Sequence, residues 1–117
     1  MHRDIKPENF VISLKNYEVK MIDFGTVKDI GSDKGPLTTY VSTRWYRAPE
    51  MVLRSHNYGP ASDIFAVGCV MAELFTATPL FPGANEMDQL DTILKILGTP
   101  SEESWKEGYK LAEKRSI

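Results

Sequence analysis

The sequence predicts an α+β fold that is mostly helical and carries one small β-hairpin. Two short apolar runs, at residues 10–14 and 19–22, are separated by four polar or aromatic residues, a pattern typical of a hairpin. Residues 25–49 show no clean periodicity, and from residue 50 onward apolar residues recur at the spacings of a helix. These three observations together indicate the fold class.

The segment between hairpin and helices is predicted to be a long loop. Residues 25–49 hold three glycines, two prolines and many hydroxyl side chains. Loops of this length in compact domains are usually functional or disordered.

The helical half begins with a short helix predicted over residues 50–54. Ser62 is a plausible N-cap for a second helix over residues 63–76. That segment is apolar nearly all round, so we expect it to be buried in the centre of the domain.

Two further helices are indicated towards the other end of the sequence. Met87, Leu90, Leu94 and Leu97 recur at spacings of three and four, and Gly98 should end that amphipathic helix. Residues 99–102 combine a possible N-cap, a proline at the first helical position and a glutamate at the third. They resemble a capping box that opens another short helix.

Composition excludes several classes of protein. The net charge of −2 is spread over interspersed acids and bases, so nucleic acid is not an expected partner. The lone Cys69 fits a reduced, intracellular setting. The longest apolar stretch, residues 64–74, is too short for a membrane span, and no signal peptide is expected at Met1. A metal-hydrolase centre is not expected either, since the two histidines lie far apart.

The candidate site residues lie in two segments, residues 2–9 and 23–25. Asp4 can orient a substrate hydroxyl or accept its proton, and Lys6 can lie near a transferred phosphate. Asn9 offers a neutral oxygen to Mg²⁺, and Asp23 would hold the ion from the other side. Gly25 is expected to let the backbone turn sharply after Asp23. His2 is expected to be a packed loop residue and not a ligand or base.

The order of these motifs resembles that of eukaryotic protein kinases. His-Arg-Asp-x-Lys-x-x-Asn at residues 2–9 is followed by Asp-Phe-Gly at 23–25 and Ala-Pro-Glu at 48–50. Any one of the three is a weak signal, because a lone aspartate in a loop is usually a turn former or a cap. The order and spacing of all three make the resemblance specific.

Four segments of the sequence resemble one particular group of protein kinases and one family within it. Residues 40–50, 79–83 and 97–100 resemble the MAP-kinase-related (CMGC) group of serine/threonine kinases. Residues 105–112 are similar to the RCK family, which includes the male germ cell-associated, intestinal cell and MOK kinases. The resemblance implies transfer of the ATP γ-phosphate to protein hydroxyls with ATP and Mg²⁺ as cofactors. Proline-directed protein substrates and an upstream activating kinase are implied as partners.

The resemblance also implies a regulatory switch in the long loop. Thr38 and Tyr40 occupy the positions of the Thr-x-Tyr dual phosphorylation site of the group, with Thr39 in place of the usual acidic residue. Phosphate adds charge and acceptor oxygens that can order a loop against cations. The implied phosphate-pocket cations are Arg3, Lys28, Arg44 and Arg47. By residue type alone, these side chains could equally be solvated surface residues.

Three structural roles follow from the resemblance. Thr43 would bond to Asp4 and Lys6 and shape the substrate site. Asp63 would anchor the catalytic-loop backbone, although a plain helix N-terminal charge is the simpler interpretation. Glu50 would pair with an arginine that lies beyond the printed sequence.

As a domain, residues 1–117 are expected to form a partial kinase domain, the large (C-terminal) lobe truncated at both ends, from the catalytic loop to the start of the group-specific insert. The small lobe that covers ATP is expected to be absent, so the isolated chain should be a weak or inactive kinase. A non-catalytic kinase-like scaffold or a truncated gene product is the alternative. An intracellular location is expected, in the cytoplasm, nucleus or cilium.

Overall fold

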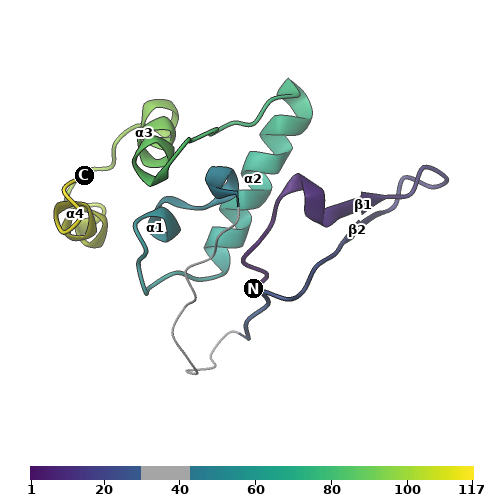
Figure 1. Ribbon diagram of the computed structural model, residues 1–117, viewed down its shortest axis with the longest axis horizontal. Coiled ribbons are helices and arrows are strands. Elements are labelled where there is room, and N and C mark those ends of the chain that lie inside the picture. The colour runs from purple at the N-terminus through teal and green to yellow at the C-terminus, as the bar shows by residue number, and fades with distance from the viewer. Residues whose placement is uncertain (30–42) are drawn as a thin grey trace.

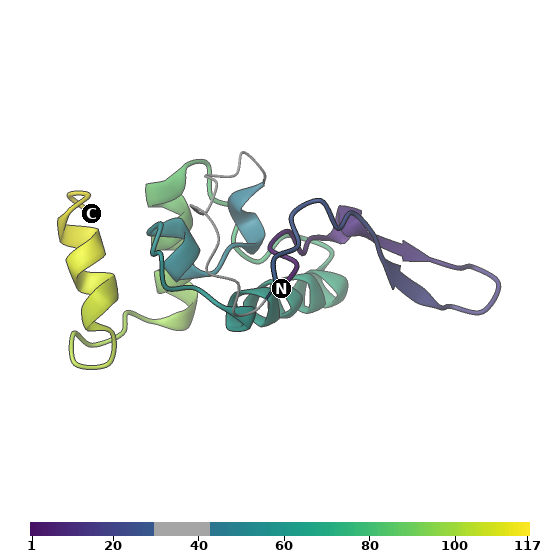
Figure 2. The same cartoon turned by 90° about the horizontal axis from the view of Figure 1, so that it is seen from below.

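The computed structural model describes residues 1–29 and 43–117. The predicted phosphorylation positions Thr38 and Tyr40 lie outside the described residues. In chain order the elements are η1 (Pro7–Asn9), β1 (Phe10–Ile12), β2 (Val19–Met21), η2 (Arg44–Tyr46), α1 (Pro49–Val52), α2 (Pro60–Thr76), α3 (Glu86–Leu97) and α4 (Lys106–Glu113). The hairpin projects from one end of the molecule, α2 lies in the middle, and α4 forms the other end (Figures 1 and 2). The predicted α+β class is confirmed.

The hairpin pairs β1 with β2 in antiparallel register, with Phe10 opposite Met21 and Ile12 opposite Val19. The strands are shorter than the apolar runs because the turn closes early. Ser13 donates its backbone N–H to the carbonyl of Glu18 at 2.9 Å. The turn therefore takes up residues that the apolar pattern alone assigns to the strands.

Helix α2 begins at Pro60, and the prediction of Ser62 as its N-cap is wrong. Gly59 is the N-cap, and Pro60 suits the first turn because it has no N–H to leave unpaired. The Ser62 hydroxyl instead donates to Oε1 of Glu50 at 2.7 Å. A tertiary hydrogen bond therefore uses the side chain that the local pattern assigned to capping.

One face of α2 is buried and the other is exposed, so the prediction of a helix buried all round is wrong for this structure. Ser62, Ala66 and Cys69 form the buried face. Ile64 is 70% and Phe75 is 85% exposed on the opposite side. No helix in the described part of the chain is long and apolar enough to cross a membrane.

Helix α3 has Asn85 as its N-cap, whose side chain accepts from the Asp88 N–H at 2.9 Å. Gly98 ends the helix with φ of 85°, as predicted. The predicted capping box at residues 99–102 is wrong, because residues 102–104 form a turn and α4 starts at Lys106. Ser101 serves that turn instead: its carbonyl accepts from the Ser104 and Trp105 N–H groups.

Two apolar clusters hold these elements together. The larger lies between residues 2–9 (the catalytic loop implied by the resemblance), η2, α2 and α3. It contains Ile5, Tyr46, Ala66, Cys69, Phe81 and Ile93. The smaller joins α1 and α3, with Trp105 and Leu111 of the α4 region packed against it. Burial raises the pKa of the Cys69 thiol to about 11, so this side chain stays protonated and acts as a small apolar residue.

Candidate active site

Residues 2–9 run across the first turn of α2, where Asp63 holds their backbone. Asp63 Oδ2 accepts from the His2 N–H at 2.7 Å, and Oδ1 accepts from the Arg3 N–H at 2.9 Å. Arg3 has φ of 71°, a left-handed conformation that an arginine rarely adopts. The contact implied for Asp63 by the sequence resemblance is therefore present, and it supports a strained turn just before Asp4.

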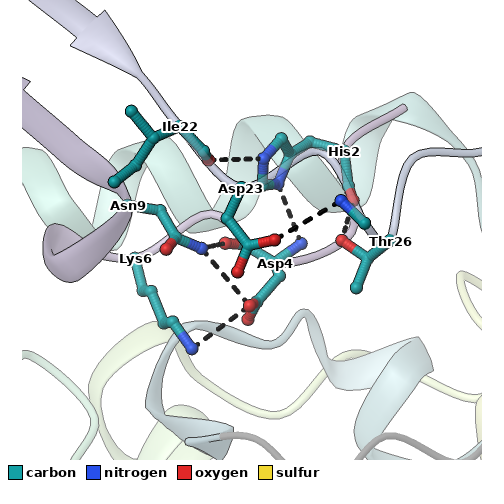
Figure 3. Close-up of polar contacts among 8 residues, drawn as sticks. His2, Asp4, Lys6, Asn9, Ile22, Asp23 and Thr26 are labelled. Carbon is teal, nitrogen blue, oxygen red and sulfur yellow. Dashed lines mark hydrogen bonds and ion pairs between the residues drawn. The ribbon is translucent and has the colours of Figure 1, made fainter.

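His2 is packed between this loop and the segment after β2 (Figure 3). Its Nδ1 accepts from the Asp4 N–H at 3.2 Å, while its Nε2 lies 3.3 Å from the Ile22 carbonyl. An accepting Nδ1 requires the proton on Nε2, where it can be donated to Ile22. The ring also meets Phe24 edge-on, with centroids 5.7 Å apart. His2 is therefore a positioned packing residue, in line with the sequence prediction.

Asp4 lies at the centre of the site and is only 9% exposed. The Lys6 ammonium lies 3.1 Å from its Oδ2. The Asn9 amide nitrogen donates to the Asp4 carbonyl at 2.7 Å and to Oδ2 at 3.3 Å (Figure 3). Two side chains, Lys6 from the loop and Asn9 from η1, thus converge on the Asp4 carboxylate and fix its orientation.

Asp23 lies beside this group, and here one sequence prediction is wrong. The sharp turn falls on Asp23 itself, with φ of 62°, while Gly25 has no positive φ. Aspartate tolerates this conformation because its side chain can bond to the backbone two residues on, and Oδ1 accepts from the Gly25 N–H at 3.4 Å. Thr26 then ties the segment to the catalytic loop, since its buried hydroxyl donates to the His2 carbonyl at 2.6 Å.

The donor set fits a hard cation. Because the Asn9 amide nitrogen is directed at Asp4, the amide oxygen is the atom with which Asn9 can ligate a metal. The exposed Asp23 carboxylate supplies the second kind of oxygen. Mg²⁺ prefers oxygen ligands and commonly takes one or two protein groups together with substrate phosphates. Among the described residues, no cluster of three or more His, Cys, Asp or Glu side chains offers a different metal site.

Two of the predicted phosphate-pocket cations, Arg3 and Arg47, lie on one narrow cavity together with Asp4 and Thr43. Arg3 donates through Nε to the Thr26 carbonyl at 2.6 Å. Burial and the neighbouring Arg44 lower the pKa of Arg47. An anion placed near Arg44 and Arg47 would relieve the repulsion between their charges.

The remaining predicted site residues are Lys28, Thr43 and Glu50. Half-buried Lys28 joins the catalytic loop through its backbone, whose N–H donates to the Met1 carbonyl at 3.0 Å. Thr43 lines the cavity beside Asp4, and its implied bonds to Asp4 and Lys6 stay predictions. Glu50 accepts from Ser62, which holds α1 against α2.

The structure also reveals contacts that sequence reasoning missed. The Trp45 indole Nε1 donates to the Gly83 carbonyl at 3.0 Å, and the Gly83 N–H donates to Oε1 of Gln89 at 3.1 Å. The Tyr46 hydroxyl donates to Glu73 at 2.6 Å, and burial, with that carboxylate second, raises the Tyr46 pKa. No local signal could have found these contacts, because each partner lies on a different element.

Comparison with known proteins agrees with this geometry. Serine/threonine-protein kinase ICK of Mus musculus is 54% identical over 111 residues, covering 95% of this chain and 17% of the relative. Cyclin-dependent kinase F-3 of Oryza sativa subsp. japonica is 51% identical over 116 residues, covering 99% of this chain and 26% of the relative. Serine/threonine-protein kinase MAK of Homo sapiens is 50% identical over 111 residues, covering 95% and 18%.

These relatives confirm the resemblance to the RCK family and to the CMGC group. The chain spans only about a sixth to a quarter of the length of the relatives it matches. The sequence profile described as "Protein kinase domain" matches residues 1–116. With the catalytic-loop geometry and the partial large-lobe fold, this match shows that the chain belongs to the protein kinase domain family.

Proposed function

We propose that this chain carries the catalytic loop of a serine/threonine protein kinase, which transfers the γ-phosphate of ATP to hydroxyl groups of protein substrates. The observation that supports this best is the Asp4 carboxylate, held between the Lys6 ammonium at 3.1 Å and the Asn9 amide at 3.3 Å. Phosphoryl transfer needs mainly positioning and charge stabilisation, and this group provides both.

Asp4 is the residue that would meet the substrate hydroxyl. With its carboxylate orientation fixed by Asn9, it can accept a hydrogen bond from that hydroxyl. It can then take the proton as the new oxygen–phosphorus bond forms and the bond from the γ-phosphorus to the leaving ADP oxygen breaks. Lys6 lies beside the same oxygen and can stabilise negative charge on the transferred phosphoryl group. Thr43 borders the same cavity and would contact the substrate chain.

Asn9 and Asp23 would hold Mg²⁺, which when bound neutralises charge on the ATP phosphates. The chain prepares these two oxygen donors in different ways. Asn9 is buried and fixed by Asp4, whereas Asp23 is exposed and held by its own strained turn. Because Asn9 and Asp23 would provide the metal ligands, the Asp4 carboxylate remains available to the substrate hydroxyl.

We infer that an upstream kinase activates the enzyme by phosphorylating Thr38 and Tyr40, and that the enzyme is a proline-directed kinase. The support for the switch is the grouping of Arg3 and Arg47 on the cavity beside Asp4, with Arg44 close enough to lower the Arg47 pKa. The proline preference rests on the resemblance to the CMGC group. Phosphatase treatment of the active protein should lower its activity, and equal activity before and after treatment would contradict the switch.

We further propose that the 117-residue chain by itself is a weak kinase or inactive. The printed sequence contains no Gly-x-Gly-x-x-Gly loop and no Val-Ala-Ile-Lys strand, both of which position ATP in kinases.

The protein is proposed to act inside the cell, in the cytoplasm, nucleus or cilium. Cys69, a buried free thiol, is compatible with a reducing compartment.

The test compares Asp4→Asn with wild type in the whole protein that contains this chain. Loss of a positioned proton acceptor should lower kcat by about 10²–10⁴-fold with little change in the KM for ATP. Asp91→Asn is the matched control, since Asp91 is exposed on α3 and should leave kcat within about twofold. Wild-type protein that transfers no phosphate, with or without prior activation, would refute the kinase proposal and favour a non-catalytic scaffold.

A further inference from the structure

The segment from Thr43 to Arg47 lies against the catalytic loop, since Thr43, Tyr46 and Arg47 line the same cavity as Asp4. A protein substrate whose hydroxyl reaches Asp4 must pass beside this segment. Trp45 lies in the middle of it, half-buried against the larger apolar cluster. Its indole Nε1 donates to the Gly83 carbonyl at 3.0 Å, so the position of Gly83 helps to decide where the segment lies.

Gly83 is in turn held tightly by Gln89. A Cβ atom added to Gly83 would lie 2.4 Å from the Gln89 Cα, so no other residue fits without displacing the backbone of α3. The Gly83 N–H donates to the Gln89 Oε1 at 3.1 Å and also meets the Phe81 carbonyl at 3.0 Å. Trp45, Gly83 and Gln89 therefore form a continuous connection from the catalytic side to α3.

Gln89 is an unusual residue for its place. It is 0% exposed and lies on the buried face of α3 with Leu90 and Ile93. Its Nε2 is the one buried side-chain nitrogen or oxygen that lacks a hydrogen-bond partner within the described part of the chain. Burying an unpaired donor is unfavourable, and a leucine of similar size would avoid it. Stability alone does not explain a glutamine at this position.

We propose that Gln89 is a positioning residue for the protein substrate. Its Oε1 orients Gly83, and the Gly83 carbonyl orients Trp45 and the substrate-facing segment beside Asp4. This inference rests on the proposed kinase function. It predicts that Gln89 affects the binding of protein substrate more than the handling of ATP.

The test is Gln89→Leu in the whole protein. The KM for a protein substrate should rise roughly tenfold, because displacements of about 1 Å far from the chemistry have effects of up to about 10²-fold. The KM for ATP and the melting temperature should stay close to those of wild type. Stability is retained because leucine removes the unpaired donor and the Gly83 N–H keeps the Phe81 carbonyl.

A second variant, Trp45→Phe, keeps an apolar aromatic ring and removes the indole N–H together with the five-membered ring that carries it. Because both residues act through Gly83, the double variant should raise the KM no further than the larger single effect. Ile93→Val is the matched control: it is buried on the same helix, and should lower the melting temperature while leaving the KM for protein substrate unchanged.

The outcomes separate the two proposals. An unchanged KM in Gln89→Leu, or multiplying effects in the double variant, overturns the positioning role of Gln89 and leaves the kinase function intact. A KM that rises equally in Ile93→Val overturns it as well, because a general loss of packing would then explain the effect. Absence of phosphate transfer by wild type overturns the kinase function and this inference with it.

Discussion

Replacing Asp63 by alanine removes the acceptor that holds the catalytic-loop backbone against α2. Both carboxylate oxygens are in use, at 2.7 Å to the His2 N–H and 2.9 Å to the Arg3 N–H. The second of these donors belongs to a residue in a left-handed conformation. Such a conformation persists only where surrounding contacts support it. Loss of Asp63 should therefore lower stability and also displace Asp4.

The magnitude follows from the two bonds. Hydrogen bonds to a charged group contribute about 1.5–3 kcal/mol each, so two would contribute about 3–6 kcal/mol if fully buried. Asp63 is only half-buried, and water can replace part of each bond. We therefore expect Asp63→Ala to lower the free energy of unfolding by about 2–4 kcal/mol. Asp63→Asn keeps one accepting oxygen and should fall between alanine and wild type.

Urea denaturation of the kinase domain that contains this chain measures these changes. Asp91→Ala is the matched control, because its ion pair with Lys95 lies on the surface of α3 and its loss should leave the free energy of unfolding close to that of wild type. The reasoning is refuted if Asp63→Ala unfolds within about 0.5 kcal/mol of wild type. A stability loss with unchanged kcat would refute the link between Asp63 and the position of Asp4.

Two further predictions concern the attachment of α4. Gly108→Ala should destabilise the domain by about 1–3 kcal/mol in thermal melts, because the new Cβ would lie 2.2 Å from the Trp105 ring. Gly68→Ala is the control. A Cβ at this position of α2 meets open space, so the substitution should be neutral or stabilising in the same melts. Hydrogen bonds from Ser55, the larger cause, and from Asn57 lower the pKa of the Glu107 carboxyl. The ionised carboxylate therefore contributes its full stabilisation above the unfolded-state pKa. This contribution disappears as the pH falls through the lower folded-state pKa. The melting-temperature difference between wild type and Glu107→Gln should therefore shrink as pH is lowered from about 7 to about 3, and a constant difference would contradict this assignment.

Elements with a local cause were predictable from sequence. The hairpin at residues 10–22 follows from two short apolar runs separated by a polar connection, and the end of α3 follows from Gly98. Local patterns failed where two local solutions competed. At the start of α2, Pro60 began the helix before Ser62 could cap it, and before α4 Ser101 formed a turn in place of a capping box.

For the candidate site, the sequence predicted the identity of the residues better than the backbone conformation and contacts that position them. Asp4, Lys6, Asn9 and Asp23 were recognised by their order and spacing, and the first three do converge. The strained residue after β2 was assigned to Gly25 by residue type, yet it is Asp23. Aspartate can adopt this conformation because its own carboxylate bonds to the following turn, a compensation that residue type does not reveal.

The sequence by itself determined the chemistry of the catalytic loop, the hairpin and the helix that Gly98 ends, because these depend on residue types a few positions apart. Only the tertiary structure decided what holds that chemistry in place. Asp63 reaches the catalytic loop from 61 and 60 residues away, and Gln89 reaches the Trp45 segment through Gly83. Such contacts form between elements whose packing is set by shape and burial of the whole core. A pattern in the sequence around either partner therefore cannot reveal them, and the Asp63 contact was expected only from the family resemblance.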